Sequence, residues 1–257
     1  MPKYGYLVVE GPHDTEFVYR LLRPFGLKRI RLEPELDPFF EPLIPRKYPP
    51  DGDLQKRMNI PLFLQSDSHA IAVHSAVGDS RLVGTVEENA SVLDIARVTG
   101  IGILLDSDKA LPAQTRYKSI KDGLMAKKFN LPENPGEIAV GPPRLGAFVL
   151  PNNMDIGTLE DLLIECAQQV YPGLLTSATT HVDACLGDPT LDATDLEDIK
   201  KPAGRNKAIV GSIASILRPG KAIQVSIQDN RWLRGNALTI ARIKGVQDFL
   251  AAVLELR

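Results

Sequence analysis

The feature of the sequence that most constrains its fold is the alternation of short apolar runs with segments of helical spacing. The apolar runs cover residues 4–9, 70–74, 101–105 and 147–150. Apolar side chains recur at helical spacing in residues 15–22, 87–97, 113–128 and 158–170. This order predicts an α/β fold with a mostly parallel sheet, right-handed crossovers and helices on both faces.

The run from Ile101 to Leu105 has the character of a central strand. It is continuously apolar and is bounded by Gly100 and Asp106. A parallel strand that helices cover on both faces shows this unbroken apolar character. Because ligands of such sheets bind at the carboxyl ends of the strands, we expect the functional site beside Asp106.

A proline-rich segment separates the first two predicted strands. Residues 34–61 hold seven prolines and show no sustained periodicity. Proline interrupts both helices and sheet ladders, so this segment predicts irregular structure. We expect an insertion or flap at about residues 30–65, within a first domain that extends over residues 1–175.

The remainder of the chain predicts a loop followed by helices. Residues 183–198 contain six acids and neither Lys nor Arg, as is typical of an exposed loop. Residues 207–217 and 243–256 have helical spacing. We therefore expect residues 176–257 to form an acidic loop and a basic helical C-terminal part that packs on the first domain.

The formal net charge of −2 conceals an uneven distribution of charge. Residues 200–257 carry 11 Lys and Arg against 3 Asp and Glu, whereas residues 1–199 carry 19 against 29. A basic segment beside an acidic core can bind phosphate backbones, which makes nucleic acid, either DNA or RNA, the expected partner. The other interpretation of this charge is a solvated helical face.

Several classes of site and location lack support. Cys166 and Cys185 form neither a CxxC pair nor a cluster with the four scattered histidines, so no zinc site is predicted. There is no GxxxxGK[ST] motif, so any ATPase would be a separate partner. No apolar run reaches the roughly 18 residues that span a membrane, and we expect a cytoplasmic protein.

Three acids follow predicted strands and define the expected site. Glu10 follows the first strand, and Asp106 and Asp108 follow the central one. Alternate residues of an extended segment point to the same side, so the two aspartates can share a cation. Oxygen ligands without His or Cys favour Mg²⁺ or Mn²⁺. The alternative is structural, with Glu10 as a helix-start acid and Asp106 to Asp108 as a turn.

Three segments in this order resemble motifs of the Toprim domain, which topoisomerases, DnaG-type primases and overcoming-lysogenization-defect nucleases share. The segments are VVEGPHD at 8–14, SAVG at 75–78 and LLDSD at 104–108. LPNN at 150–153 and GTLED at 157–161 also resemble the end of a small uncharacterised group of prokaryotic Toprim-like proteins. The resemblance covers roughly residues 4–170.

The resemblance implies roles for particular residues. Glu10 would be a metal ligand or a proton-handling group, and Asp106 and Asp108 would bind the divalent ion. In the nuclease branch a second acid lies one helical turn after the first and a later acid serves a second metal, positions that Asp14 and Glu160 match. Asp161 is a further candidate.

That branch also places a lysine near the scissile phosphate, and the residue that corresponds to it here is Lys207. A surface helix residue is the alternative interpretation of Lys207. Two residue groups outside the motifs are ambiguous. His13 can contact a phosphate or face solvent from a turn, and Trp232 with Arg231 and Arg234 can stack on a base or pack at the edge of the core.

The function that the resemblance implies is metal-dependent hydrolysis of a phosphodiester bond in nucleic acid. Two ions about 4 Å apart can activate a water and stabilise the leaving oxygen, while a lysine neutralises the developing charge. Two other functions fit the same residues. One is a non-catalytic nucleic-acid-binding or regulatory module on the Toprim scaffold, and the other is an enzyme that hydrolyses small phosphoesters.

Overall fold

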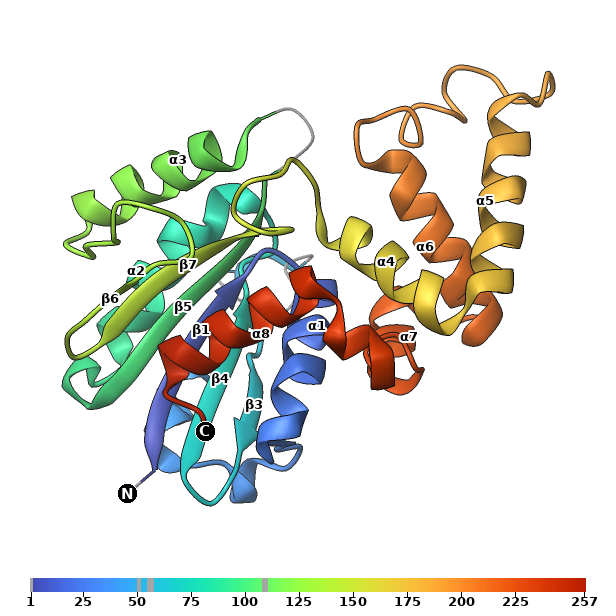
Figure 1. Cartoon of the computed structure of the whole chain (residues 1–257). Helices are drawn as coiled ribbons and strands as arrows, with labels where there is room; N and C mark the ends of the chain where they lie inside the picture. The colour runs from blue at the N-terminus through green and yellow to red at the C-terminus, as the bar shows by residue number, and fades with distance from the viewer. Residues whose placement is uncertain (1, 50–51, 55–57, 108–110) are drawn as a thin grey trace.

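The computed structural model describes residues 2–49, 52–54, 58–107 and 111–257. These residues form a seven-stranded sheet between two layers of helices, with a further group of helices beside it (Figure 1). The strands are β1 (Lys3–Val9), β2 (Lys28–Arg29), β3 (Leu62–Gln65), β4 (His69–Ser75), β5 (Val98–Asp106), β6 (Ile138–Ala139) and β7 (Arg144–Leu150).

The sheet has the strand order β2-β3-β4-β1-β5-β7-β6. Its four central strands, β4, β1, β5 and β7, are parallel to one another. The outer strands pair antiparallel with their neighbours: β3 with β4 and β2 with β3 on one side, and β6 with β7 on the other. The predicted α/β fold with a largely parallel sheet is confirmed, but the three short edge strands were not predicted.

Strand β1 shows why helices cover both faces of the sheet. Tyr4, Tyr6 and Val8 point into the hydrophobic core on one face, and Leu7 and Val9 point into the core on the other. Because successive side chains of a strand point to opposite faces, a strand without polar alternation must be buried on both sides. Burial on both faces explains why continuously apolar strands such as β1 lie in the centre of the sheet.

The helices of the described residues are α1 (Pro12–Leu22), α2 (Leu82–Val92), α3 (Ala113–Ala126), α4 (Leu159–Val170), α5 (Pro172–Leu186), α6 (Gly204–Leu217), α7 (Ile223–Asp229) and α8 (Ala241–Leu254). Helices α2 and α3 cover one face of the sheet, and α1 and α8 cover the other (Figure 1). The group α4 to α7 lies beside this sandwich and confirms that the C-terminal part is helical.

Two helices begin earlier than the spacing predicts. Helix α1 starts at Pro12, since proline lacks an N–H and is well suited to the first turn of a helix. Helix α2 starts at Leu82, and it ends at Val92 because Leu93 has an extended backbone. The prediction of a helix over residues 87–97 therefore placed this helix five residues too far toward the carboxyl end of the chain.

The last helix of the chain completes the sandwich. Helix α8 packs so closely on β5 that a Cβ atom at Gly100 would lie 1.9 Å from the carbonyl oxygen of Val253. Glycine is therefore required at this crossing. Phe249, Val253 and Leu254 of α8 are buried in the same core as Leu7 of β1.

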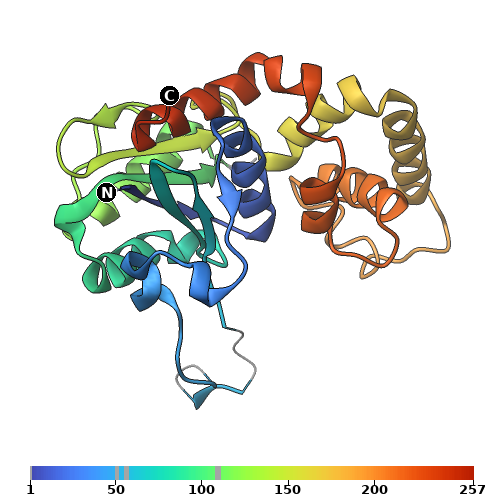
Figure 2. The same cartoon turned by 90° about the horizontal axis from the view of Figure 1, so that it is seen from below.

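The proline-rich insertion is more ordered in its first half than its composition indicates. Two 3₁₀ turns, η2 (Glu33–Glu35) and η3 (Pro38–Leu43), precede the described residues 44–49. In η3, Phe39 stacks on Tyr4 with 4.0 Å between ring centroids, and Phe40 is buried. Figure 2 shows residues 44–49 extending away from the sheet. Part of the insertion thus belongs to the core.

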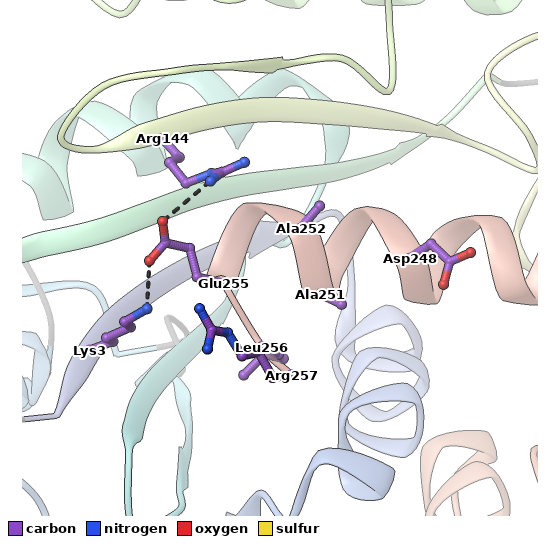
Figure 3. A pocket seen from close by; sticks show the side chains of 8 residues that line it. All are labelled: Lys3, Arg144, Asp248, Ala251, Ala252, Glu255, Leu256 and Arg257. Atoms are coloured by element: carbon purple, nitrogen blue, oxygen red, sulfur yellow. Dashed lines mark hydrogen bonds and ion pairs between the residues drawn. The ribbon is translucent and has the colours of Figure 1, made fainter.

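Charged residues join α8 to the amino ends of two strands (Figure 3). Glu255 lies between Lys3 of β1, at 2.7 Å, and Arg144 of β7, at 3.3 Å. They line an open hollow of about 480 Å³ at the opposite end of the strands from Glu10 and Asp106. None of the helices in the described residues is long and apolar enough to span a membrane.

Candidate functional site

The candidate site is a cavity of about 300 Å³ at the carboxyl ends of the central strands. Its charged and titratable lining residues come from the ends of β1 and β5 and from the helices α1, α4 and α6. They are Glu10, His13, Asp14, Asp106, Glu160 and Lys207. The chain therefore brings four carboxylates and one lysine together from segments that are up to 197 residues apart in sequence.

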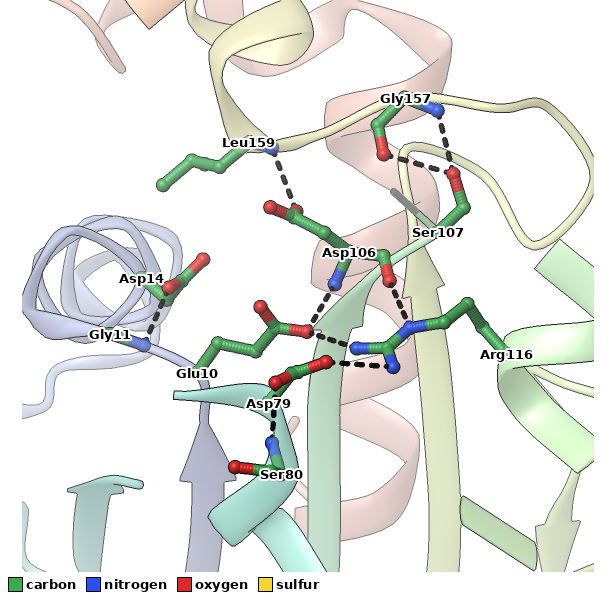
Figure 4. A network of polar contacts seen from close by, with 10 residues as sticks. All are labelled: Glu10, Gly11, Asp14, Asp79, Ser80, Asp106, Ser107, Arg116, Gly157 and Leu159. Carbon is green, nitrogen blue, oxygen red and sulfur yellow. Dashed lines mark hydrogen bonds and ion pairs between the residues drawn. The ribbon is translucent and has the colours of Figure 1, made fainter. Parts of the chain in front are cut away.

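Asp106 lies at the centre of the polar network in Figure 4. Its carboxylate Oδ1 accepts a hydrogen bond from the N–H of Leu159 at 2.9 Å, at the start of α4, and its own N–H donates to Glu10 Oε1 at 3.1 Å. Burial raises the pKa of Asp106 well above its ordinary value, and the negative charges of Asp14 and Glu10 raise it further. The structure thus places Glu10 beside Asp106, as their positions after the strands predict.

Arg116 of α3 reaches into this network and contacts Glu10. Its Nη2 lies 3.0 Å from Glu10 Oε1, its Nη1 lies 3.1 Å from Asp79 Oδ2, and its Nε donates to the carbonyl oxygen of Asp106 at 3.2 Å. Burial raises the pKa of Glu10, and the positive charge of Arg116 opposes this effect. The guanidinium therefore supports the ionised form of a carboxylate that burial disfavours.

Asp14 belongs to the first turn of α1 and faces the same cavity. Its Oδ2 accepts a hydrogen bond from the N–H of Gly11 at 2.9 Å, which closes the amino end of the helix. Burial and the charge of Glu10 raise the pKa of Asp14 to about 7. This residue thus combines a structural hydrogen bond with a position among the other acids.

The two acids at the start of α4 differ in their surroundings. Glu160 is 7% exposed, lines the cavity, and accepts a hydrogen bond from Thr158 Oγ1 at 2.8 Å. Asp161 instead accepts from the N–H of Thr158 at 2.8 Å and from Asn206 Nδ2 at 2.7 Å. Asp161 caps the helix, and we assign it no part in the cavity.

Lys207 reaches the cavity from α6, the third helix of the group α4 to α7. The residue is exposed and lines the same space as His13 and Glu160. Burial lowers the pKa of His13, and the positive charge of Lys207 lowers it further while Glu160 raises it. His13 therefore lines the cavity between a cation and an anion.

The segment after β4 forms the remaining wall through a strained turn. Val77 has a φ of +56° and Gly78 a φ of +125°. A positive φ is unusual for a β-branched residue, and strained backbone of this kind is found in clusters at functional sites. The turn is held by Ala76 N–H donating to Val9 O at 2.8 Å and by Gly78 N–H donating to Glu10 O at 3.0 Å.

The donor set of the cavity suits a hard divalent cation. Its candidate ligand atoms are carboxylate oxygens, which Mg²⁺ and Mn²⁺ prefer. Burial raises the pKa of three of these acids, Glu10, Asp14 and Asp106. Across residues 2–49, 52–54, 58–107 and 111–257, no group of three or more His, Cys, Asp or Glu side chains is placed so that it could hold a metal ion. Asp108, the second predicted acid of the DSD segment, lies outside the described residues.

Sequence reasoning missed the arginine and one of its partners. Arg116 stands in the first turn of the predicted helix that follows the DSD segment, and Asp79 follows the glycine of the SAVG segment. Both residues lie close in sequence to the predicted motifs, and this proximity was the one signal that could have identified them as part of the site. Trp232 is fully buried and donates its Nε1 to Ser226 Oγ at 2.9 Å, which confirms the structural interpretation of the tryptophan.

Comparison with known proteins gives a family and one similar structure. The model of a family described as "Protein of unknown function (DUF3226)" matches residues 4–253. The chain is also similar to the crystal structure of hypothetical protein PH0156 from Pyrococcus horikoshii OT3, with 17% identity, 98% coverage of each chain and a TM-score of 0.49. No curated protein matches the chain. Neither description names a ligand or an activity.

Proposed function

The chain belongs to the DUF3226 family, and we propose that it is a divalent-metal-dependent phosphodiesterase that hydrolyses nucleic acid on a Toprim-like domain. The position of Glu10 after the first strand, next to Asp106 at the end of the adjacent parallel strand, supports the Toprim assignment. The SAVG segment follows β4, on the other side of β1, and contributes Val77 and Gly78 to the cavity.

One observation carries the proposal. Four carboxylates from separate segments, those of Glu10, Asp14, Asp106 and Glu160, line one cavity of about 300 Å³. Clustering buried acids of like charge costs folding free energy, and a bound cation would lower this cost in addition to Arg116, which contacts Glu10. A divalent cation is the partner that matches both their charge and their oxygen atoms.

These four acids would hold Mg²⁺ or Mn²⁺, together with Asp108 as a predicted further ligand. The bound ion would supply Lewis acidity, which lowers the pKa of a coordinated water and stabilises charge on phosphate oxygens. Asp106 is suited to the central ligand position because it adjoins both Glu10 and the start of α4. Glu10 would have to exchange its hydrogen bond with Arg116 for the ion.

The remaining steps can be assigned to residues of the chain. In the hydrolysis a water oxygen bonds to phosphorus, the P–O ester bond breaks, and the leaving oxygen takes up a proton from solvent. Glu10 would accept the proton that the attacking water loses. Lys207 would neutralise negative charge that develops on the phosphate, a role that its exposed position at the cavity permits.

Nucleic acid is the substrate class that the charge distribution supports. The basic segment 200–257 includes α6, so the cation at the cavity belongs to the part of the chain with the highest positive charge. Phosphate backbones bind such segments with release of counterions. A second phosphate contact outside the cavity would favour a polymer over a small phosphoester.

The test is a side-by-side assay of single-stranded and duplex DNA, RNA and a small aryl phosphodiester with Mg²⁺, Mn²⁺ or EDTA. We expect cleavage of a nucleic acid with either metal, none with EDTA, and none by the Asp106→Ala variant, which should keep its circular dichroism spectrum. Cleavage of the small ester alone would favour the small-phosphoester alternative. Salt-sensitive binding of nucleic acid without cleavage under any divalent ion would favour the non-catalytic alternative and overturn the proposal.

A further inference from the structure

Three arginines converge on a second hollow, away from the acidic cavity. The hollow measures about 300 Å³ and is lined by Arg20, Arg23 and Arg234 together with the apolar side chains of Pro24, Leu233 and Leu238 and with Gly235. Arg20 lies in the last turn of α1, six residues beyond Asp14, which corresponds to about 9 Å along the helix. No acid is among these lining residues, all of which lie in the described part of the chain.

Arg20 is the fixed element of this hollow. It is 3% exposed, and its guanidinium donates to the carbonyl oxygens of Gln228 at 2.9 Å and Leu233 at 3.3 Å. Its buried Nε has no hydrogen-bond partner among the described atoms. The two carbonyl groups orient the guanidinium, but they carry no formal charge that would neutralise it.

The other two arginines are exposed and add to the positive charge. Burial lowers the pKa of Arg20, and the positive charges of Arg234 and Arg23 lower it further. By contrast, the exposed Arg46 has an acid beside it, Glu33, at 2.6 Å. Three guanidinium groups around one hollow without an acid would be relieved of their mutual repulsion by a bound anion.

We infer that this hollow is a binding site for a phosphate group, separate from the acidic cavity. Guanidinium groups bind phosphate oxygens through paired hydrogen bonds, and one buried, oriented arginine reduces the entropy that binding must overcome. The phosphate can belong to a nucleic-acid backbone or to a small soluble compound. The same chemistry serves both sources, and the following experiment distinguishes them.

The test uses the full chain in EDTA, so that neither metal binding nor cleavage contributes. Binding of a fluorescein-labelled 20-nucleotide DNA is measured by anisotropy at several salt concentrations, and binding of inorganic pyrophosphate is measured by calorimetry. The variants are Arg23→Ala and Arg234→Ala, both at exposed positions, with Arg46→Ala as the matched control. Circular dichroism checks that each variant is folded.

We expect each of the two substitutions to weaken phosphate binding by roughly five- to tenfold, whereas Arg46→Ala has no effect. If the ligand is a nucleic-acid backbone, DNA binding weakens and the salt dependence falls by about one counterion per arginine removed. If the ligand is a small compound, only pyrophosphate binding weakens. Unchanged binding of both probes in folded Arg23→Ala and Arg234→Ala variants would overturn the inference, whatever the outcome of the cleavage assays.

Discussion

Arg116 Nη2 lies 3.0 Å from Glu10 Oε1, although 106 residues separate the two in the sequence. The arginine side chain is 13% exposed and the glutamate side chain 20%, so water screens the pair only in part. The guanidinium of Arg116 therefore already binds one carboxylate oxygen of Glu10, which we propose as a metal ligand. Arg116 and a divalent ion would compete for Glu10.

The first prediction concerns this competition. Arg116→Met should lower the free energy of unfolding in EDTA by about 1–3 kcal/mol, because it leaves Glu10 and Asp79 without their cation. The same substitution should tighten Mg²⁺ binding, since Glu10 no longer has to leave the guanidinium. Urea denaturation and calorimetric Mg²⁺ titration measure the two effects.

A double-mutant cycle separates this effect from lost packing. Adding Glu10→Gln to Arg116→Met should restore part of the lost stability, because a neutral amide needs no counter-charge. Arg116→Lys keeps the charge without the planar fork and should lie between the wild type and Arg116→Met. Strictly additive effects of the Glu10 and Arg116 substitutions would show that the pair is energetically unimportant.

The second prediction concerns Asp106 and the metal. Mg²⁺ or Mn²⁺ should raise the melting temperature of the wild type, and at about 100 times the dissociation constant the stabilisation would be about 2.7 kcal/mol. Asp106→Asn should abolish this increase. In EDTA the variant should be at least as stable as the wild type, because the substitution removes a negative charge whose burial already raises its pKa.

Differential scanning fluorimetry with and without each metal provides the measurement. Asp122→Asn, which changes an exposed acid of α3, is the matched control and should keep the full response to metal. An equal metal-dependent shift in Asp106→Asn would contradict the assignment of Asp106 as a ligand.

The third prediction concerns Lys207. Lys207→Ala should reduce the rate of phosphodiester cleavage by about 10²-fold, as expected for removal of a group that stabilises transition-state charge. Its effect on the Mg²⁺ concentration for half-maximal activity should be small, because an amine does not bind this ion. Single-turnover kinetics over a Mg²⁺ series tests both statements.

Lys221→Ala serves as control for the general loss of positive charge, since Lys221 is also exposed but does not line the cavity. A comparable rate reduction in both lysine variants would indicate general electrostatic attraction of the substrate. It would remove the specific role of Lys207.

The fourth prediction concerns pH. Burial lowers the pKa of His74 to about 4, and its Nδ1 lies 3.3 Å from the hydroxyl of Tyr6. Between pH 6.5 and about 4 the unfolded chain binds a proton that the folded protein excludes. The free energy of unfolding therefore falls as the pH decreases through this window, by about 1.4 kcal/mol per pH unit from this residue.

His74→Phe should flatten this part of the pH profile, measured by urea denaturation from pH 4 to 8. The difference between variant and wild type isolates His74 from Asp14, whose raised pKa acts in the opposite direction. His181→Asn, at an exposed position of α5, should keep the wild-type profile. A parallel profile for His74→Phe would show that His74 does not titrate in this way.

Local sequence patterns determined the core of the fold. The apolar runs at 4–9 and 101–105 predicted β1 and β5 because each strand is buried on both faces and tolerates no polar alternation. The proximity of Glu10 to Asp106 followed from the same pattern, since parallel neighbouring strands end at the same edge of a sheet. Metal binding by these acids stays a prediction.

Other features depend on packing between segments that carry no mutual signal. Strand β3 is only four residues long, and its pairing with β4 is a choice of partner that its own sequence does not encode. Glycine is required at position 100 because α8 crosses β5 there in close contact, and only the tertiary structure brings these two elements together. Close approach of this kind depends on the directions of two elements, which neither element specifies alone.

The charged residues show the same division between sequence and tertiary structure. The sequence by itself determined that Glu10 and Asp106 follow strands, because strand ends are marked by local changes in hydropathy. Only the tertiary structure decided that Arg116 pairs with Glu10 and that Arg20 joins Arg23 and Arg234 around a hollow without an acid. The physical reason is that any of the 30 basic residues could pair with any acid, and the choice is made by the burial and orientation that packing imposes.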